Sequence, residues 1–162
     1  MLTQEPIREP MRDPILVVDD TPLIAAGLKE VLRSIQSEMQ PTQPDIRVEY
    51  ACNIYTALSS KAFSGKTFSL IVLGSVEGHS PCNTLRNIES LKTEFPGARI
   101  MLYTDQYNPE IIDKVEEGKL DAYVHKQEDV DEVRHALTRI FSGEPYLSPL
   151  LDALYHTWRF NR

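Results

Sequence analysis

Residues that build metal centres and disulfide frameworks are scarce in this sequence of 162 residues. It contains two cysteines and four histidines. The cysteines, Cys52 and Cys82, lie outside any CxxC or Cys/His pattern, and no two histidines have HxH or HxxxH spacing. We therefore expect both cysteines to be reduced and structural, and we expect no metal site built on histidine.

Positive charge and long apolar runs are also scarce. The formal net charge is -7 and the pI is about 5.1, so the chain lacks the basic excess that favours binding to phosphate backbones. No apolar run is long enough to span a bilayer, and the N-terminal sequence MLTQEPIREPMRDP lacks the apolar core of a signal peptide. We therefore expect a cytoplasmic location, no membrane contact and no nucleic-acid binding through these residues.

The rest of the composition is that of a globular protein. Hydrophobic residues make up 41% and charged residues 25% of the chain, and its length suits one domain with tails. Residues 1–13 are polar, contain two prolines and show no periodicity, which favours a flexible arm. Residues 14–142 are the expected domain, and residues 143–162 are predicted to form a linker followed by an amphipathic helix outside its core.

Short apolar runs alternate with segments of helical periodicity throughout the expected domain. Strands are predicted at residues 15–18, 46–50, 69–74, 98–104 and 121–126. Helices are predicted to follow them, beginning at Thr21-Pro22 and continuing with 54–62, 83–95, 109–117 and 129–142. Regular alternation of this kind predicts an α/β fold, with a parallel sheet covered by helices on both faces.

Polar residues stand where the predicted strands end. Asp19 and Asp20 follow the first strand, Gly74 ends the third, Thr104 ends the fourth and Lys126 ends the fifth. The carboxyl ends of parallel strands meet at one edge of the sheet, where ligands bind. Two acids, a hydroxyl and an ammonium group at one edge suit a hard cation and a phosphoryl group.

Each of these residues also has a plainer interpretation. Asp20-Thr21 alone is a good helix start, and Gly74 alone could be a loop glycine with positive φ. Tyr123, in the fifth strand, could simply pack against the fourth helix. Glu77 and His79 could form an acid–base pair, although a solvated loop is the better interpretation.

Four stretches, ILVVDDTP, FSLIVLG, RIMLYT and DAYVHK, resemble the receiver domains of bacterial two-component response regulators. The resemblance covers about residues 14–142 and implies a flavodoxin-like fold with a five-stranded parallel sheet of order 2-1-3-4-5. It implies that Asp19 and Asp20 correspond to the magnesium-binding acids and that Thr104 corresponds to the residue that contacts the phosphoryl oxygens. Lys126 would form an ion pair with the site, and Tyr123 would change rotamer together with the hydroxyl residue.

One residue of the family pattern is missing, because the phosphorylated aspartate falls at Gly74, which has no side chain to phosphorylate. The usual proline after the lysine is also replaced, by Gln127. These departures imply no catalytic residue, no required cofactor and a weak or absent magnesium site at Asp19 and Asp20. With no phosphate to bind, Lys126 is predicted to form a direct ion pair with Asp19 or Asp20.

The resemblance implies a phosphorylation-independent signalling and protein-interaction module. A protein partner or a second copy would bind through the fourth helix (109–117), the fifth strand (121–126) and the fifth helix (129–142), and a histidine kinase is a further candidate partner. Alternatively, GEPYLSP and the amphipathic helix after it resemble the junction between receiver and linker in LuxR-type transcription regulators. The helix-turn-helix domain of such a regulator would lie beyond Arg162.

Two further alternatives involve phosphate chemistry. Asp19 could be the nucleophile of a haloacid-dehalogenase-type phosphatase, although the second acid of that family should lie two residues later, where this chain has Thr21. The receiver could also be phosphorylated on a substitute residue such as Asp20 or Ser75.

Overall fold

The computed structural model describes residues 13–74 and 81–161. The predictions made for the N-terminal arm therefore lie almost wholly outside the described residues, and so do those made for Ser75, Glu77 and His79.

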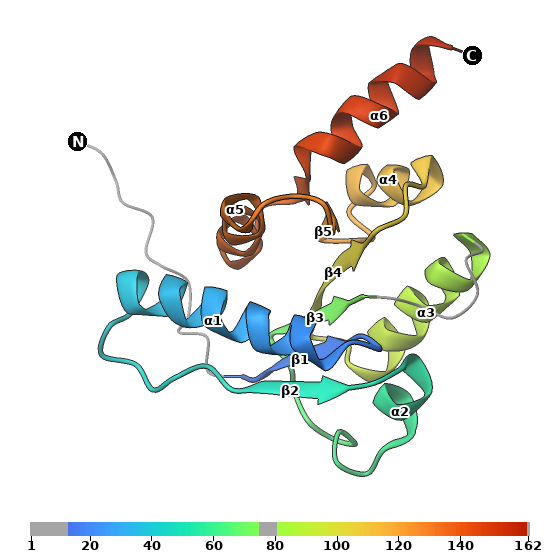
Figure 1. Cartoon of the computed structure of the whole chain (residues 1–162). Helices are drawn as coiled ribbons and strands as arrows, with labels where there is room; N and C mark the ends of the chain where they lie inside the picture. The colour runs from blue at the N-terminus through green and yellow to red at the C-terminus, as the bar shows by residue number, and fades with distance from the viewer. Residues whose placement is uncertain (1–12, 75–80, 162) are drawn as a thin grey trace.

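Six parallel strands form one sheet in the order β2-β1-β3-β4-β5-β6 (Figure 1). Their bounds are Ile15–Val18 for β1, Val48–Ala51 for β2, Leu70–Leu73 for β3, Arg99–Thr104 for β4, Ala122–His125 for β5 and Tyr146–Leu147 for β6. The five expected strands occur in the expected order, and the expected α/β fold with a parallel sheet is confirmed.

Helices cover both faces of this sheet. On one face lie α1 (Pro22–Met39) and α5 (Val130–Phe141). On the other lie α2 (Ile54–Ser59), α3 (Pro81–Glu94), α4 (Pro109–Glu116) and α6 (Pro149–Phe160). The second helix is shorter than predicted and ends before Ala62.

The two central strands show why a continuous apolar run predicts a buried strand. All four residues of β1 and all four of β3 are buried. Because successive side chains of a strand point to opposite faces, Leu16 and Val18 pack in the core below α3 and α4, and Ile15 and Val17 pack below α1 and α5. The first loop residues after both strands are thereby brought to the same edge.

The C-terminal segment corrects the sequence analysis. The first part of residues 143–162 was predicted to be a linker, but Tyr146 and Leu147 form β6, which pairs with β5. The following helix was predicted to lie outside the core, yet in α6 Leu151 is fully buried and Tyr155 is 6% exposed. The Tyr155 hydroxyl donates to Asp113 Oδ1 of α4 at 2.6 Å. The start of α6 is therefore part of the domain, while its end projects away from the sheet (Figure 1).

Of the helices that the structure describes, none has both the length and the apolar composition that crossing a bilayer requires.

Candidate functional site

Asp19 lies at the carboxyl end of β1 and is completely buried. Its Oδ1 accepts a hydrogen bond from the backbone N–H of Thr21 at 2.8 Å. Its Oδ2 accepts one from Lys126 Nζ, also at 2.8 Å. A buried carboxylate needs such partners, because an unpaired charge in the interior is strongly unfavourable.

Lys126 reaches Asp19 across the ends of two intervening strands, since β3 and β4 lie between β1 and β5. Its backbone N–H donates to Thr104 O at 2.9 Å, and its ammonium group lies 5.9 Å from the centre of the Tyr103 ring. The side chain is 18% exposed. The predicted ion pair between Lys126 and one of the two acids is confirmed, with Asp19 as the partner.

Gly74 follows β3 directly beside this pair. A Cβ atom built on Gly74 would overlap Asp19 Oδ2 and would lie 2.6 Å from Asp19 Cγ and 2.9 Å from Asp19 Cβ. Gly74 is not among the described glycines with positive φ, so the interpretation as a loop glycine that adopts positive φ is wrong. A side chain at position 74 would therefore displace the Asp19 carboxylate, which occupies that space.

Asp20 does not join Asp19. It is exposed, and its Oδ1 accepts from the hydroxyl of Thr21 at 3.1 Å. Magnesium requires several oxygen ligands in near-octahedral geometry, but both oxygens of Asp19 already accept hydrogen bonds, one of them from a cation. Within residues 13–74 and 81–161, no group of three or more His, Cys, Asp or Glu side chains could hold a metal ion. As they lie, the two acids do not fit a magnesium site.

Thr104 and Tyr123 both contact Gln106, in the loop between β4 and α4. Thr104 Oγ1 accepts from the Gln106 N–H at 3.4 Å, and the fully buried Tyr123 donates its hydroxyl hydrogen to Gln106 O. Burial raises the pKa of Tyr123 well above its usual value. The structure thus links Thr104 and Tyr123 through one loop residue, while Asp19, Gly74 and Lys126 form the centre of the site.

Sequence reasoning missed two tyrosines near this centre. Burial and then the Asp19 carboxylate raise the pKa of Tyr103 in β4. Burial, Cys52 and Asp19 raise the pKa of Tyr50 in β2. Their sequence signal is their position, because each stands one residue before the end of its strand and therefore close to the edge that holds the site.

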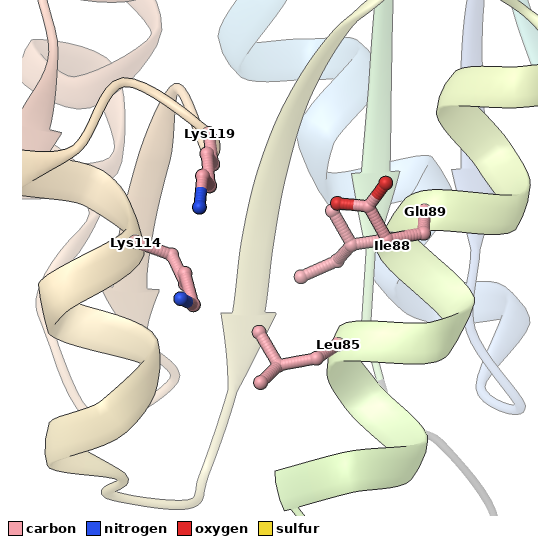
Figure 2. A pocket seen from close by; sticks show the side chains of 5 residues that line it. All are labelled: Leu85, Ile88, Glu89, Lys114 and Lys119. Carbon is pink, nitrogen blue, oxygen red and sulfur yellow. The ribbon is translucent and has the colours of Figure 1, made fainter.

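A separate groove of about 330 Å³ lies between α3 and α4 (Figure 2). Its lining residues are Leu85, Ile88 and Glu89 on one side and Lys114 and Lys119 on the other. Both ammonium groups lie within ion-pair distance of Glu117 Oε2, at 3.4 Å for Lys114 and 3.0 Å for Lys119. Glu117 thus offsets part of the positive charge of this groove. None of the groove residues belongs to the strand-end site, which consists of Asp19, Gly74, Thr104, Tyr123 and Lys126.

The parallel sheet of this order, with an acid after β1 and a lysine after β5, is the arrangement that the resemblance to receiver domains implies. No protein-family model matches the chain, and no curated protein matches it. Solved structures do match, and they show that the chain has the fold of response-regulator receiver domains.

Three of these structures illustrate the similarity. A LuxR family DNA-binding response regulator from Silicibacter pomeroyi matches with a TM-score of 0.62 and 26% identity, over 85% of this chain and 97% of that one. A two-component response regulator of the LuxR family from Aurantimonas sp. SI85-9A1 matches with a TM-score of 0.66 and 19% identity, over 91% and 98%. The RcsB response regulator of Salmonella typhimurium matches with a TM-score of 0.66 and 16% identity, over 89% of this chain. The present chain covers 65% of that RcsB chain.

Proposed function

We propose that this chain is an atypical response-regulator receiver that acts as a signalling and protein-interaction module without being phosphorylated. The observation that carries the proposal is the position of Asp19, whose carboxylate lies against Gly74 and binds Lys126. Asp19, Asp20, Thr104, Tyr123 and Lys126 are in this view the remains of a phosphoryl and switch site.

The chemistry of the site supports this proposal in two ways. Gly74 has no oxygen to accept a phosphoryl group, and the space beside it is occupied. Lys126, which in a phosphorylated receiver would stabilise added negative charge, already has a buried carboxylate as its partner. The positive charge of Lys126, which a phosphoryl group would otherwise neutralise, is therefore already neutralised by Asp19.

A module of this kind signals by binding a partner in one of two conformations, and the partner must bind them with different affinity. We propose that the surface formed by α4, β5 and α5 binds this partner, which is either a second copy or another protein such as a histidine kinase. A cytoplasmic location fits such a role.

The second candidate is the receiver part of a LuxR-type transcription regulator. The favouring observation is the similarity to response regulators of the LuxR family, one of which is named as DNA-binding. In this candidate the DNA-binding domain would follow Arg162. The present residues do not supply the basic surface, because their net charge is -7.

A phosphatase of the haloacid-dehalogenase type is disfavoured. A nucleophilic carboxylate must reach a phosphorus atom, but Asp19 is fully buried and both of its oxygens accept hydrogen bonds. Thr21 also stands where that family has its second acid. The solved neighbours are signalling proteins, which agrees with a non-catalytic role.

The decisive experiment is incubation with a small phosphodonor and magnesium, followed by intact mass measurement. We expect no phosphoryl gain on the wild-type chain, while a receiver with its aspartate intact, treated in parallel, gains one. Gly74→Asp is the matched variant, and a gain confined to it would support the assignment of position 74. A phosphoryl gain on the wild-type chain, on Asp20, Ser75 or any other residue, would overturn the proposal.

A further inference from the structure

The start of α6 lies beside the end of β5 and the turn that carries Lys126. Two hydrogen bonds connect these segments. The backbone N–H of His125 donates to Ser148 Oγ at 3.2 Å, and the backbone N–H of Leu150 donates to Glu128 Oε1 at 2.6 Å. The donor and acceptor of the first contact are buried, since Ser148 is 0% and His125 6% exposed.

These contacts replace the usual cap of a helix. Ser148 is the N-cap residue of α6, but its hydroxyl makes no cap hydrogen bond and instead accepts from β5. Pro149 has no N–H, so the first free amide of the helix is that of Leu150, and the Glu128 carboxylate binds it. A carboxylate at this end is favoured by the helix dipole as well as by the hydrogen bond. Glu128 therefore caps α6 from a different element of the fold.

Glu128 belongs to the turn of residues 125–128, and Lys126 in the same turn is held by two residues of the site. The Lys126 ammonium binds Asp19, and the Lys126 N–H donates to Thr104 O. The backbone N–H of Glu128 donates to His125 O at 3.0 Å, which closes the turn, and the His125 ring lies 2.9 Å from Asp105 O. The residue that pairs with Asp19 and the residue that caps α6 thus lie two positions apart in one hydrogen-bonded turn.

We propose that Glu128 is a positioning residue that couples the Asp19–Lys126 pair to the start of α6, so that the first turn of the helix is held less firmly when the pair is broken. The coupling concerns the regulation of the C-terminal helix and does not depend on whether the chain is phosphorylated. Through this coupling, a change in the Asp19–Lys126 pair would alter α6, and α6 would pass the change on to a partner bound at the C-terminal end of the chain.

Native-state amide hydrogen exchange on the full chain tests the first link. Glu128→Ala removes the cap, and we expect the amides of Leu150 and the first turn of α6 to exchange about fivefold faster relative to those of α1. Glu128→Gln keeps an acceptor without the charge and should restore part of the protection. Glu144→Ala is the matched control, because it removes an exposed carboxylate that pairs with Arg139 at 2.7 Å.

The second link is tested at the site. Lys126→Met should accelerate exchange in α6 beyond its effect on α1, and it should add little when Glu128 is already alanine. Lys66→Met is the control, because it removes an exposed ion pair with Glu49. Trp158 is the single tryptophan of the chain and stacks on Tyr155, so acrylamide quenching of its fluorescence should increase in the same variants.

Equal acceleration of α1 and α6 in Lys126→Met, or additive effects of the two substitutions, would overturn the coupling. So would unchanged α6 exchange in Glu128→Ala. The mass measurement described above is independent of these outcomes, so failure of the coupling and failure of the phosphorylation-independent role are distinguishable.

Discussion

The carboxylate of Asp19 and the backbone of Gly74 are complementary: the acid fills the space that glycine leaves open. Lys126, the lysine after β5, and the buried acid Asp19 therefore neutralise each other's charge. The missing side chain at position 74 is therefore a structural requirement of the present arrangement, and it cannot be restored without moving Asp19.

Substitution of Gly74 by alanine should destabilise the fold. The new Cβ overlaps Asp19 Oδ2, so the carboxylate must move and its bond to Lys126 must weaken. We expect a loss of about 3 kcal/mol in the free energy of unfolding, measured by denaturant titration. Gly97→Ala is the matched control, because nothing lies within 4 Å of its added Cβ, and it should change stability by less than about 0.5 kcal/mol.

A double-mutant cycle identifies Asp19 as the cause of that loss. Asp19→Ala removes the atoms that overlap most with the new Cβ, so Gly74→Ala should cost less in that background than in the wild type. Equal costs in both backgrounds would show that the glycine is required for another reason.

Removal of Lys126 should be more harmful than removal of an exposed cation. Lys126→Met leaves the buried Asp19 carboxylate without its counter-ion and should cost about 3–5 kcal/mol, with little dependence on salt. Adding Asp19→Asn should recover part of this stability, because no charge then remains buried. Lys66→Met, which breaks a more exposed pair, should cost less than about 1 kcal/mol.

Alkaline pH should unfold the protein through its tyrosines. Burial raises the pKa of Tyr103, Tyr123 and Tyr146, and the hydrogen bond from Tyr146 to Glu132 raises that of Tyr146 further. The folded state holds these protons more tightly than the unfolded state does. The protonated tyrosines therefore make their full contribution to the free energy of unfolding below pH 10, the usual pKa of tyrosine, and this contribution is lost as pH rises above that value. Ultraviolet titration should show native tyrosines ionising at higher pH than those of the urea-unfolded chain. Coincident curves would contradict the burial of these hydroxyls.

The C-terminal helix should contribute to the stability of the whole domain. Leu151 is fully buried, so Leu151→Ala should cost about 2–5 kcal/mol in global unfolding. Leu154, on the same helix, is 39% exposed, and Leu154→Ala should cost much less. If both substitutions left the unfolding midpoint unchanged, α6 would be an independent appendage, as the sequence alone suggested.

The sequence predicted the sheet well because the strands of a doubly wound fold are short, continuous apolar runs. ILVV and LIVL are such runs, and both are buried throughout. Parallel pairing then fixes which residues meet at the carboxyl edge. The ion pair of Lys126 with one of two acids was therefore predictable from the rule that strand ends gather at one edge, together with the resemblance to receiver domains, which implies an ion pair between this lysine and the site.

The choice between Asp19 and Asp20 could not be made from sequence, since it depends on which carboxylate points inward. The overlap with Gly74 could not be foreseen either, because it arises from strands that are adjacent only in the folded chain. β6 was missed because a strand of two residues carries no periodicity, and its pairing with β5 is a tertiary effect.

The two-residue strand that widens the sheet also ends it. The N–H groups of Tyr146 and Ser148 point inward, to Asp121 O and Tyr123 O. Along the outer rim the donors would come from residues 145, 147 and 149, but two of these are prolines and only Leu147 has an N–H. A foreign strand arriving at this rim would find a single N–H donor, that of Leu147, to bond its carbonyl groups. Because two prolines remove N–H donors from the β6 edge of the sheet, edge-to-edge aggregation through this strand is disfavoured.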